Sequence, residues 1–338
     1  MGKLWLNNEL VDRIAMLQHT EAEHPGINQV AIEKDWWVTV TLKALFQTDC
    51  CGSPIFKGGT SLSKGFNIIE RFSEDIDLAI SRSVFGIEKS NKSQRDKLKK
   101  LARRYIQDNL SAQLDAQLKG MGISGYTIEN IAQVQDKNGE WKPIDSDKDP
   151  TVILLHFPSI LEEAISYIPP RVRIEISCLS MDEPVQECQI YSLISETFKD
   201  EDTDANSTIR TVVPTRTFLE KMFLLAEEFQ KDKPRSVRMS RHLYDLEKLM
   251  DTDYGRDALV DHALYKTIVE HRRAYYALKY VNYDLLDPAT INFLIPKQAI
   301  ESWKEDYSNM RRFFIYGNSL EFDALMQRME ELQKRVRS

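Results

Sequence analysis

The spacing of apolar and polar positions divides the chain into two stretches. Up to about residue 208, helical spacing is mixed with strand-type alternation, and from Pro214 onward the spacing is helical. We expect an N-terminal helical segment over residues 1–50 that packs on the core. Its clearest part is AIEKDWWVTVTLKALF, where apolar residues recur every fourth position at Ile32, Trp36, Val40 and Ala44.

Strand patterns follow this helical segment. PIFK (54–57) predicts a short strand, and IDLAI (76–80) alternates, with its isoleucines and leucine on one side and Asp75 and Asp77 on the other. TVILLHF (151–157) and RVRIEISCL (171–179) also read as strands. Between the first two strands, Leu62, Phe66 and Ile69 form one helical face, which predicts a helix over 61–70 capped by Thr60 or Ser61.

The remaining segments complete an α+β architecture. We predict a turn at CGSP (51–54), a charged helical segment over 85–119, an exposed hairpin or loop over 136–150 and a polar loop or linker over 199–208. The predicted fold is an α+β core over 51–210, built as a mixed sheet with helices, followed by a C-terminal helical bundle over 211–338.

Composition narrows the functional class. The chain has 338 residues, of which 42% are hydrophobic and 29% charged, and its net charge is −7, so nucleic acid would be bound by local basic patches. Cys50, Cys51, Cys178 and Cys188 form no CxxC pair, which argues against a disulfide framework or a zinc site. No signal peptide or membrane-spanning stretch is evident, so we expect a cytoplasmic protein with no membrane partner.

Acidic residues on the predicted strands indicate a metal site. Asp75 and Asp77 are two positions apart on one strand and therefore point to the same face, which suits Mg²⁺. Glu175 lies between Ile174 and Ile176 on another strand and is a candidate third carboxylate for two metal ions. Arg171 and Arg173 share its side and would either neutralise it or bind phosphate.

The turn GGTS (58–61) is a candidate phosphate site. At a helix N-terminus its backbone N–H groups would face an anion, and its glycines allow close approach. The alternative is structural, with the turn acting only as a helix cap and Asp75 and Asp77 forming an acidic strand edge. The order and close spacing of the two elements favour the functional interpretation, although the GK[ST] ending of a Walker A loop is absent.

These residues carry a resemblance to a known family. GGTSLSKG followed by RFSEDIDL resembles the signature of the AbiEii/AbiGii-type nucleotidyltransferase-like toxins, which include the MenT toxins and belong to the polymerase-β-like superfamily. AIEKDWWVTVTLKALF is similar to the family's N-terminal helix. TRTFLEKMFLL and RHLYDLEKL resemble its segments with an essential lysine and a further essential aspartate, here Lys221 and Asp245.

The resemblance implies roles for individual residues. Asp75 and Asp77 would bind metal, Lys221 would contact phosphate, and Asp245 would support the site or the nucleophile, so these four are the expected catalytic residues. The expected nucleotide-binding residues are Lys57, Gly58, Gly59, Thr60, Ser61, Ser73, Lys221 and Arg238. The competing interpretation makes Lys221 a solvated partner of neighbouring acids and Asp245 a surface partner of Arg241.

The implied activity is transfer of a nucleoside monophosphate from an NTP, with Mg²⁺, to an acceptor such as a tRNA 3′ end. The role would be that of a toxin in a toxin–antitoxin or phage-defence system, with a cognate antitoxin as partner. The alternatives are nucleotidylation of a protein, phosphorylation or nucleotidylation of a small molecule, a non-catalytic NTP-binding module and a purely structural protein.

Two basic stretches are candidates for RNA or phosphate contacts. KDKPRSVRMSRH (231–242) has five basic residues and one acid, and Lys231, Lys233, Arg235 and Arg241 are its candidate contacts. The run 89–104 has eight basic residues and one acid, and we interpret it as a solvated helix face. Neither stretch shows the aromatic interleaving of a single-strand RNA platform.

Overall fold

The structure is a computed structural model that describes residues 3–49, 54–87, 90–136, 138–161, 168–182 and 184–338. Its contacts divide the chain into two compact units. The first, called here the sheet unit, comprises residues 1–65 and 73–211. The second, the helical unit, comprises residues 66–72 and 212–338.

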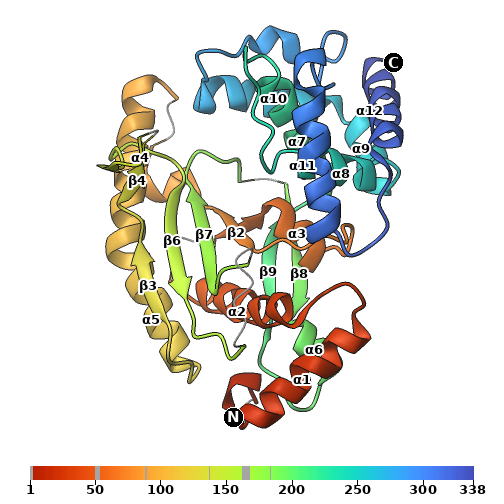
Figure 1. Ribbon diagram of the computed structural model, residues 1–338. Coiled ribbons are helices and arrows are strands. Elements are labelled where there is room, and N and C mark those ends of the chain that lie inside the picture. The colour runs from red at the N-terminus through yellow and green to blue at the C-terminus, as the bar shows by residue number, and fades with distance from the viewer. Residues whose placement is uncertain (1–2, 50–53, 88–89, 137, 162–167, 183) are drawn as a thin grey trace. The chain divides into compact units, whose positions relative to one another are not determined.

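The sheet unit is built around seven strands in the order β3-β6-β7-β2-β1-β9-β8 (Figure 1). The strands are β1 (Ile55–Lys57), β2 (Asp75–Ala79), β3 (Thr127–Asn130), β6 (Thr151–His156), β7 (Arg171–Ser177), β8 (Val185–Tyr191) and β9 (Asn206–Val212). β2 lies in the middle, antiparallel to β1 and parallel to β7, while β6 runs antiparallel to β7. This mixed sheet confirms the α+β prediction.

Apolar and polar residues alternate along the central strands β2 and β7, which explains why these strands lie in the core. Ile76 and Leu78 of β2, and Ile174 and Ile176 of β7, are fully buried on one face, as the sequence pattern predicts. α2 packs against this pair of strands. The polar residues between them face the other side, so the central strands bring acidic side chains to one face.

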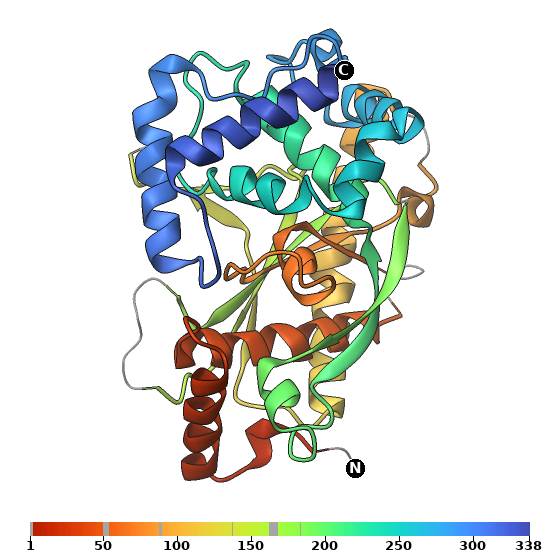
Figure 2. The ribbon, with the colours of Figure 1, turned by 90° about the vertical axis from the view of Figure 1, so that its right-hand side faces the viewer.

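Helices complete the sheet unit. They are α1 (Leu10–Glu23), α2 (Gln29–Phe46), α3 (Gly58–Lys64), α4 (Lys92–Tyr105), α5 (Ser111–Gly120) and α6 (Leu193–Thr197), and a π-helical turn (Ile106–Leu110) joins α4 to α5. Asn28 caps α2, because its side chain accepts a hydrogen bond from the Ala31 N–H. α1 packs crosswise on α2 (Figure 2), and Trp36 and Trp37 of α2 are fully buried.

One sequence expectation in this unit is wrong, and another needs its end moved. The helix predicted over 61–70 begins at Gly58 and ends at Lys64, because Gly65 caps it and residues 66–72 join the helical unit instead. The loop predicted over 199–208 is present up to Ala205, and it packs against the core. Asp202 within it is buried and accepts hydrogen bonds from the backbone N–H of Trp5 and the indole of Trp36. β9 begins at Asn206.

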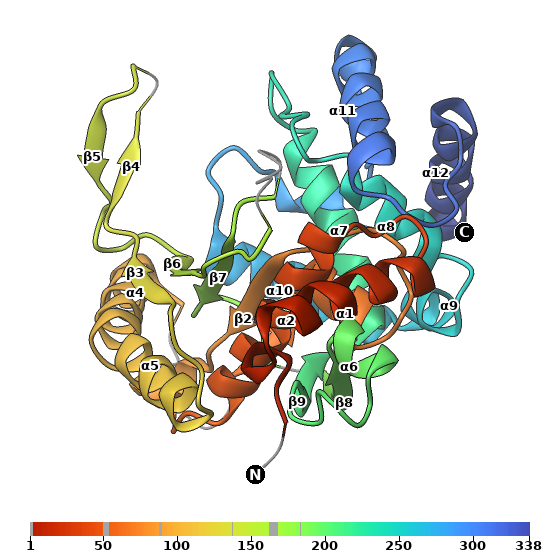
Figure 3. The ribbon, with the colours of Figure 1, turned by 60° about the horizontal axis from the view of Figure 1, so that its bottom comes forward.

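The exposed hairpin predicted near 136–150 is present. β4 (Gln133–Gln135) pairs with β5 (Trp141–Pro143), and this hairpin extends away from the main sheet (Figure 3). Cys178 and Cys188 are buried thiols. Cys50, Cys51, most of the predicted CGSP turn and Lys89 of the basic run lie outside the described residues.

The helical unit contains the predicted C-terminal helices. They are α7 (Pro214–Glu228), α8 (Arg241–Leu249), α9 (Asp253–Val260), α10 (His262–His271), α11 (Ile300–Phe313) and α12 (Phe322–Arg337). Pro214 occupies the first turn of α7, where its missing N–H costs no hydrogen bond. Among the described helices, none combines the length and apolar character that a membrane crossing needs.

Residues 66–72 belong to the helical unit through a buried charge pair. Arg71 donates from Nε and Nη2 to the two carboxylate oxygens of Asp245 on α8, at 2.7 and 2.8 Å. The Phe72 N–H donates to the Phe314 carbonyl at 2.7 Å, and the Glu70 N–H donates to the Tyr244 hydroxyl at 3.2 Å. These contacts account for the loss of helical structure after Gly65.

Asp245 is the least exposed member of this group. Its burial alone would raise its pKa, but Arg71 and Lys221 outweigh that effect and hold the pKa of Asp245 below its usual value of 3.8. The folded state therefore favours the ionised carboxylate. Its contribution to stability is complete above about pH 4 and is lost as the pH falls through the lowered pKa.

Asp245→Asn should destabilise the local structure that holds residues 66–72. Removing one partner of a buried ion pair costs about 3–5 kcal/mol, because the other charge stays buried without compensation. Hydrogen exchange at Phe72 should accelerate by roughly 100-fold or more. Asp251→Asn is the matched control, since Asp251 pairs with Arg328 and Arg335 at the surface and should change exchange little. Equal protection in both variants would contradict this assignment.

The same carboxylate should produce part of the acid sensitivity of the helical unit. Below about pH 4, Asp245 binds a proton in the unfolded state but not in the folded state, where its pKa is lowered, so the unfolding temperature should fall more steeply in the wild type than in Asp245→Asn. Calorimetry from pH 7 to pH 3 compares the two proteins. If the unfolding temperatures of the two proteins fell in parallel with pH, folding would not lower the pKa of Asp245, and the prediction would be wrong.

Candidate active site

One face of β2 presents the two predicted metal-binding aspartates. Asp75 and Asp77 are both partly exposed and alternate with buried Ile76 and Leu78. In the parallel register, Asp75 lies opposite Arg173 of β7, and Asp77 lies opposite Glu175. Strand pairing therefore brings the three predicted carboxylates to neighbouring positions on one face of the sheet.

Glu175 is paired with an arginine on its own strand. Arg173 donates from Nε to Oε1 of Glu175 at 2.7 Å, and both side chains remain partly exposed. The sequence left open whether Arg173 neutralises Glu175 or binds phosphate, and in the structure Arg173 neutralises Glu175.

Gly58 leaves the space that Asp77 occupies. The backbone of Gly58 has a φ of +84°, and a Cβ at this position would lie 2.2 Å from Oδ2 of Asp77. Lys57, the residue before it, lies opposite Asp77 in the antiparallel pairing of β1 with β2. Only glycine satisfies both the positive φ and the close approach, so the start of the GGTS turn and the DxD strand are fitted to each other.

The hydroxyl groups of the turn hold the turn together. Thr60 Oγ1 lies 2.9 Å from Ser73 Oγ and 2.5 Å from the Asp75 carbonyl, and Ser61 donates to the Gly58 carbonyl at 2.9 Å. Thr60 and Ser61 are buried. The helix α3 begins after Lys57, which supplies no side-chain cap. The groups of this turn that suit an anion are therefore its backbone N–H groups rather than its hydroxyls.

A buried ion pair fixes the start of β2. Lys34 of α2 donates to Glu74 at 2.6 Å and to the Pro169 carbonyl at 3.2 Å. Burial lowers the pKa of Lys34, although the attraction of Glu74 opposes this effect. Since Glu74 directly precedes Asp75, the pair anchors the strand that carries both aspartates.

The donor set suits a hard cation that also binds substrate. Among the described residues, no three or more His, Cys, Asp or Glu side chains are grouped so as to hold a metal ion. Mg²⁺, however, is commonly held by one or two carboxylates together with substrate phosphates. Asp75 and Asp77 fit this requirement, and Glu175 is the neighbouring carboxylate, held by Arg173 through Oε1.

In the helical unit, the structure joins Lys221 and Asp245. The Nζ of Lys221 lies 2.7 Å from Oδ2 of Asp245, so this carboxylate serves both Lys221 and Arg71. Both Lys221 and Asp245 are buried. The interpretation of Lys221 as a solvated surface lysine, and of Asp245 as a surface residue, is therefore wrong.

This cluster has an excess of positive charge. Burial lowers the pKa of Lys221, the attraction of Asp245 opposes the shift, and Arg71 adds to it. Burial and the nearby cations also hold the pKa of His242 well below its usual range, so its imidazole is neutral. Its Nδ1 is buried without a hydrogen-bond partner among the described residues.

Sequence reasoning missed Arg71 and His242. Arg71 falls within the quoted RFSEDIDL signature, but the helix expected over 61–70 obscured its role. His242 carries no sequence signal apart from its position three residues before Asp245.

The basic loop before α8 is partly neutralised. Lys231 and Arg235 both pair with the buried Glu228, at 2.7 and 3.2 Å. The Arg238 backbone N–H donates to Asp306 at 2.6 Å, and Lys233 is exposed. Arg241 is the first residue of α8. The loop keeps a net positive charge, as its sequence predicts.

The predicted residues thus fall into two sets. The sheet unit gathers the turn over 57–61, Ser73, Asp75, Asp77 and Glu175, and the helical unit gathers Lys221, Asp245 and the basic loop. The second basic run, over 89–104, lies largely on α4, where Lys99 pairs with Asp96 and Asp147. That pairing agrees with its interpretation as a solvated face.

Comparison with a solved structure supports the fold. A solved structure of MenT4, a nucleotidyltransferase toxin from Mycobacterium tuberculosis H37Rv, is similar with a TM-score of 0.52 at 16% identity. The match covers 95% of this chain and 88% of that one. No curated protein matches the chain.

The family comparison covers most of the sequence. Residues 42–328 match the family described as "Nucleotidyl transferase AbiEii toxin, Type IV TA system". This span includes the GGTS turn, the DxD strand, Lys221 and Asp245. The chain is therefore a member of the AbiEii nucleotidyltransferase toxins of type IV toxin–antitoxin systems.

Proposed function

We propose that this nucleotidyltransferase toxin transfers a nucleoside monophosphate from an NTP to an RNA acceptor, the 3′ end of a tRNA, in the presence of Mg²⁺. Asp75 and Asp77 hold the metal, and the turn over 57–61 binds the triphosphate with Ser73. Lys221 and Arg238 are the further phosphate contacts, and the cognate antitoxin opposes the activity in the cytoplasm during phage defence.

The observation that carries this proposal is the fit of Gly58 against Asp77. A helix N-terminus with no side-chain cap adjoins a strand whose two carboxylates share one face. Backbone N–H groups bind phosphate, and carboxylates bind the cation that phosphate carries. A structural cap or an acidic strand edge would not require Gly58 and Asp77 to approach each other this closely.

In the proposed reaction, an acceptor hydroxyl attacks the α-phosphate in line and pyrophosphate leaves. Bound Mg²⁺ would neutralise charge on the phosphates and on the attacking and leaving oxygens. The chain itself contributes positioning: the turn holds the triphosphate, Gly58 keeps the space for Asp77, and Lys34 with Glu74 anchors the strand. Arg173 keeps Glu175 neutralised beside Asp77.

The test is a labelling experiment. Purified protein is incubated with total RNA, Mg²⁺ and each α-labelled NTP in turn, beside Asp75→Ala/Asp77→Ala as the control. Label on a tRNA-sized band that is absent from the control supports the proposal and identifies the nucleotide. Label on protein or on a small molecule would replace the RNA acceptor with one of those classes, and chelation of the metal should abolish any transfer.

The growth phenotype gives an independent check. Expression of the wild type should arrest growth, and Asp75→Ala should relieve the arrest because a metal ligand is lost. Equal toxicity of the two proteins, at matched expression, would separate toxicity from nucleotidyl transfer.

Asp77→Asn and Glu175→Gln should differ in their effect on transfer. Loss of a metal ligand removes several kcal/mol of transition-state stabilisation, so Asp77→Asn should lower kcat by about 100-fold or more. Glu175 is paired with Arg173, and its loss should cost only about 10-fold, as for a group outside the metal ligands. Equal losses would make Glu175 a full metal ligand.

Gly58→Ala should abolish most activity, whereas Gly86→Ala should not. Both glycines have a positive φ, but a Cβ at Gly58 meets Asp77, while one at Gly86 has no heavy atom within 4 Å. The two substitutions therefore introduce similar backbone strain, but only Gly58→Ala would displace the Asp77 side chain. We expect at least a 100-fold difference in kcat/KM with similar unfolding temperatures. Similar activity of the two variants would contradict the role of Gly58.

A further inference from the structure

A segment of the helical unit interleaves basic and aromatic residues. HRRAYYALKYVNY (271–283) contains three basic residues and four tyrosines within thirteen positions. It begins at the end of α10 and continues through a π-helical turn, Arg272–Tyr276. Such interleaving is typical of surfaces that bind single-stranded nucleic acid.

Part of this segment is engaged in ion pairs and hydrogen bonds within the protein. Arg272 is buried against Glu227, with 2.6 Å between Nε and Oε1, and Arg273 pairs with Asp284 at 2.6 Å. The Tyr283 hydroxyl accepts a hydrogen bond from the Leu278 N–H at 3.0 Å. Besides the paired Arg273, the exposed members are Lys279, Tyr280 and Asn282, and Tyr280 is 45% exposed.

Tyr280 lies beside the basic loop. The Nζ of Lys231 is 5.0 Å from the centre of the Tyr280 ring. Gln230 and Asn282 exchange two hydrogen bonds, at 2.7 and 3.3 Å, which join the two segments. We call Lys231, Lys233, Arg235, Lys279 and Tyr280 the basic–aromatic surface.

This surface is electropositive on an acidic protein. Glu228 is shared by Lys231 and Arg235, so one negative charge meets two positive charges. No ion pair within the described ranges involves Lys233 or Lys279, and both are exposed. The whole chain has a net charge of −7, so a polyanion would bind at local patches of this kind.

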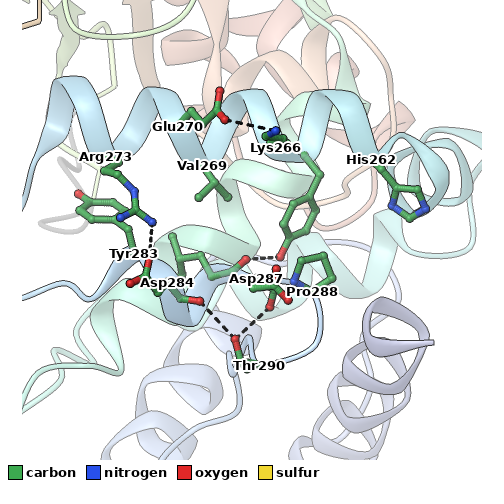
Figure 4. A pocket seen from close by; sticks show the side chains of 12 residues that line it. His262, Lys266, Val269, Glu270, Arg273, Tyr283, Asp284, Asp287, Pro288 and Thr290 are labelled. Carbon is green, nitrogen blue, oxygen red and sulfur yellow. Dashed lines mark hydrogen bonds and ion pairs between the residues drawn. The ribbon is translucent and has the colours of Figure 1, made fainter.

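The neighbouring cavity suits a polyanion poorly. It has a volume of about 600 Å³ and is lined by Arg273 and Tyr283 together with three acids, Glu270, Asp284 and Asp287 (Figure 4). Its lysine and arginine are paired, Lys266 with Glu270 and Arg273 with Asp284. The remaining carboxylate would repel phosphate, which leaves the basic–aromatic surface as the better RNA site.

We propose that the basic–aromatic surface binds the unpaired end of the RNA acceptor. A base stacks on the exposed part of the Tyr280 ring, and Lys231, Lys233 and Lys279 contact the flanking phosphates. Stacking tolerates any base, whereas the lysines select a polyanion. This inference rests on the proposed function, because it names where the acceptor of that reaction is held.

The experiment measures RNA binding separately from transfer. A fluorescent single-stranded 12-nucleotide RNA is titrated with full-length protein, and the dissociation constant is followed by anisotropy at several salt concentrations. Tyr280→Ala should weaken binding about 10-fold, while Tyr280→Phe should retain it because the ring remains. Tyr191→Ala is the matched control, since Tyr191 on β8 is 43% exposed.

Charge is tested in the same assay. Lys231→Ala/Lys279→Ala should weaken binding and lower the salt slope by about 0.7 for each phosphate contact removed. Equal affinity of Tyr280→Ala and wild type, equal weakening in Tyr280→Phe, or no RNA binding by the wild type would overturn the inference. If Tyr280→Ala left transfer to RNA unchanged, only the RNA-binding role of this surface would be contradicted. If the wild type bound RNA but transferred no nucleotide to it, the proposed function would be contradicted instead.

Discussion

A single buried carboxylate organises the helical unit. Asp245 neutralises Arg71 from residues 66–72 and Lys221 from α7, and both partners lie within 2.8 Å of it. Without the ionised Asp245, two buried cations would face each other and the neutral His242. The residue that the family resemblance marks as essential is therefore also one on which the local structure depends.

The sheet unit relies on a different constraint, the register of its central strands. Because β2 pairs in register with β1 and β7, Asp77 has Lys57 on one side and Glu175 on the other. A shift of one residue would turn both aspartates into the buried face. The close approach of Gly58 to Asp77 secures the same arrangement from the side of the turn.

Charge distribution links these two constraints to function. An acidic chain repels nucleic acid overall, yet it keeps a cationic excess around Lys221 and on the basic loop. Buried cations that share one carboxylate are suited to anionic phosphate, and exposed lysines beside a tyrosine are suited to an RNA strand. Both features are consistent with a nucleotidyltransferase whose acceptor is a nucleic acid.

The sequence alone determined the chemistry of the DxD strand and the family. Alternation along IDLAI and RVRIEIS is a local property, so it predicted which side chains share a face, and the GGTS and RFSEDIDL motifs predicted the fold class. The parallel pairing of β2 with β7, which brings Glu175 beside Asp77, is a long-range contact that no local pattern encodes.

Only the tertiary structure decided the fate of residues 66–72 and the role of Asp245. Leu62, Phe66 and Ile69 have helical spacing, but Gly65 ends the helix and Arg71 gains more from a buried carboxylate than from a helical turn. Likewise, Asp202 resembles part of a polar linker until Trp5 and Trp36 are seen to donate to it. Burial of a charge depends on partners far along the chain, and a sequence window does not contain those partners.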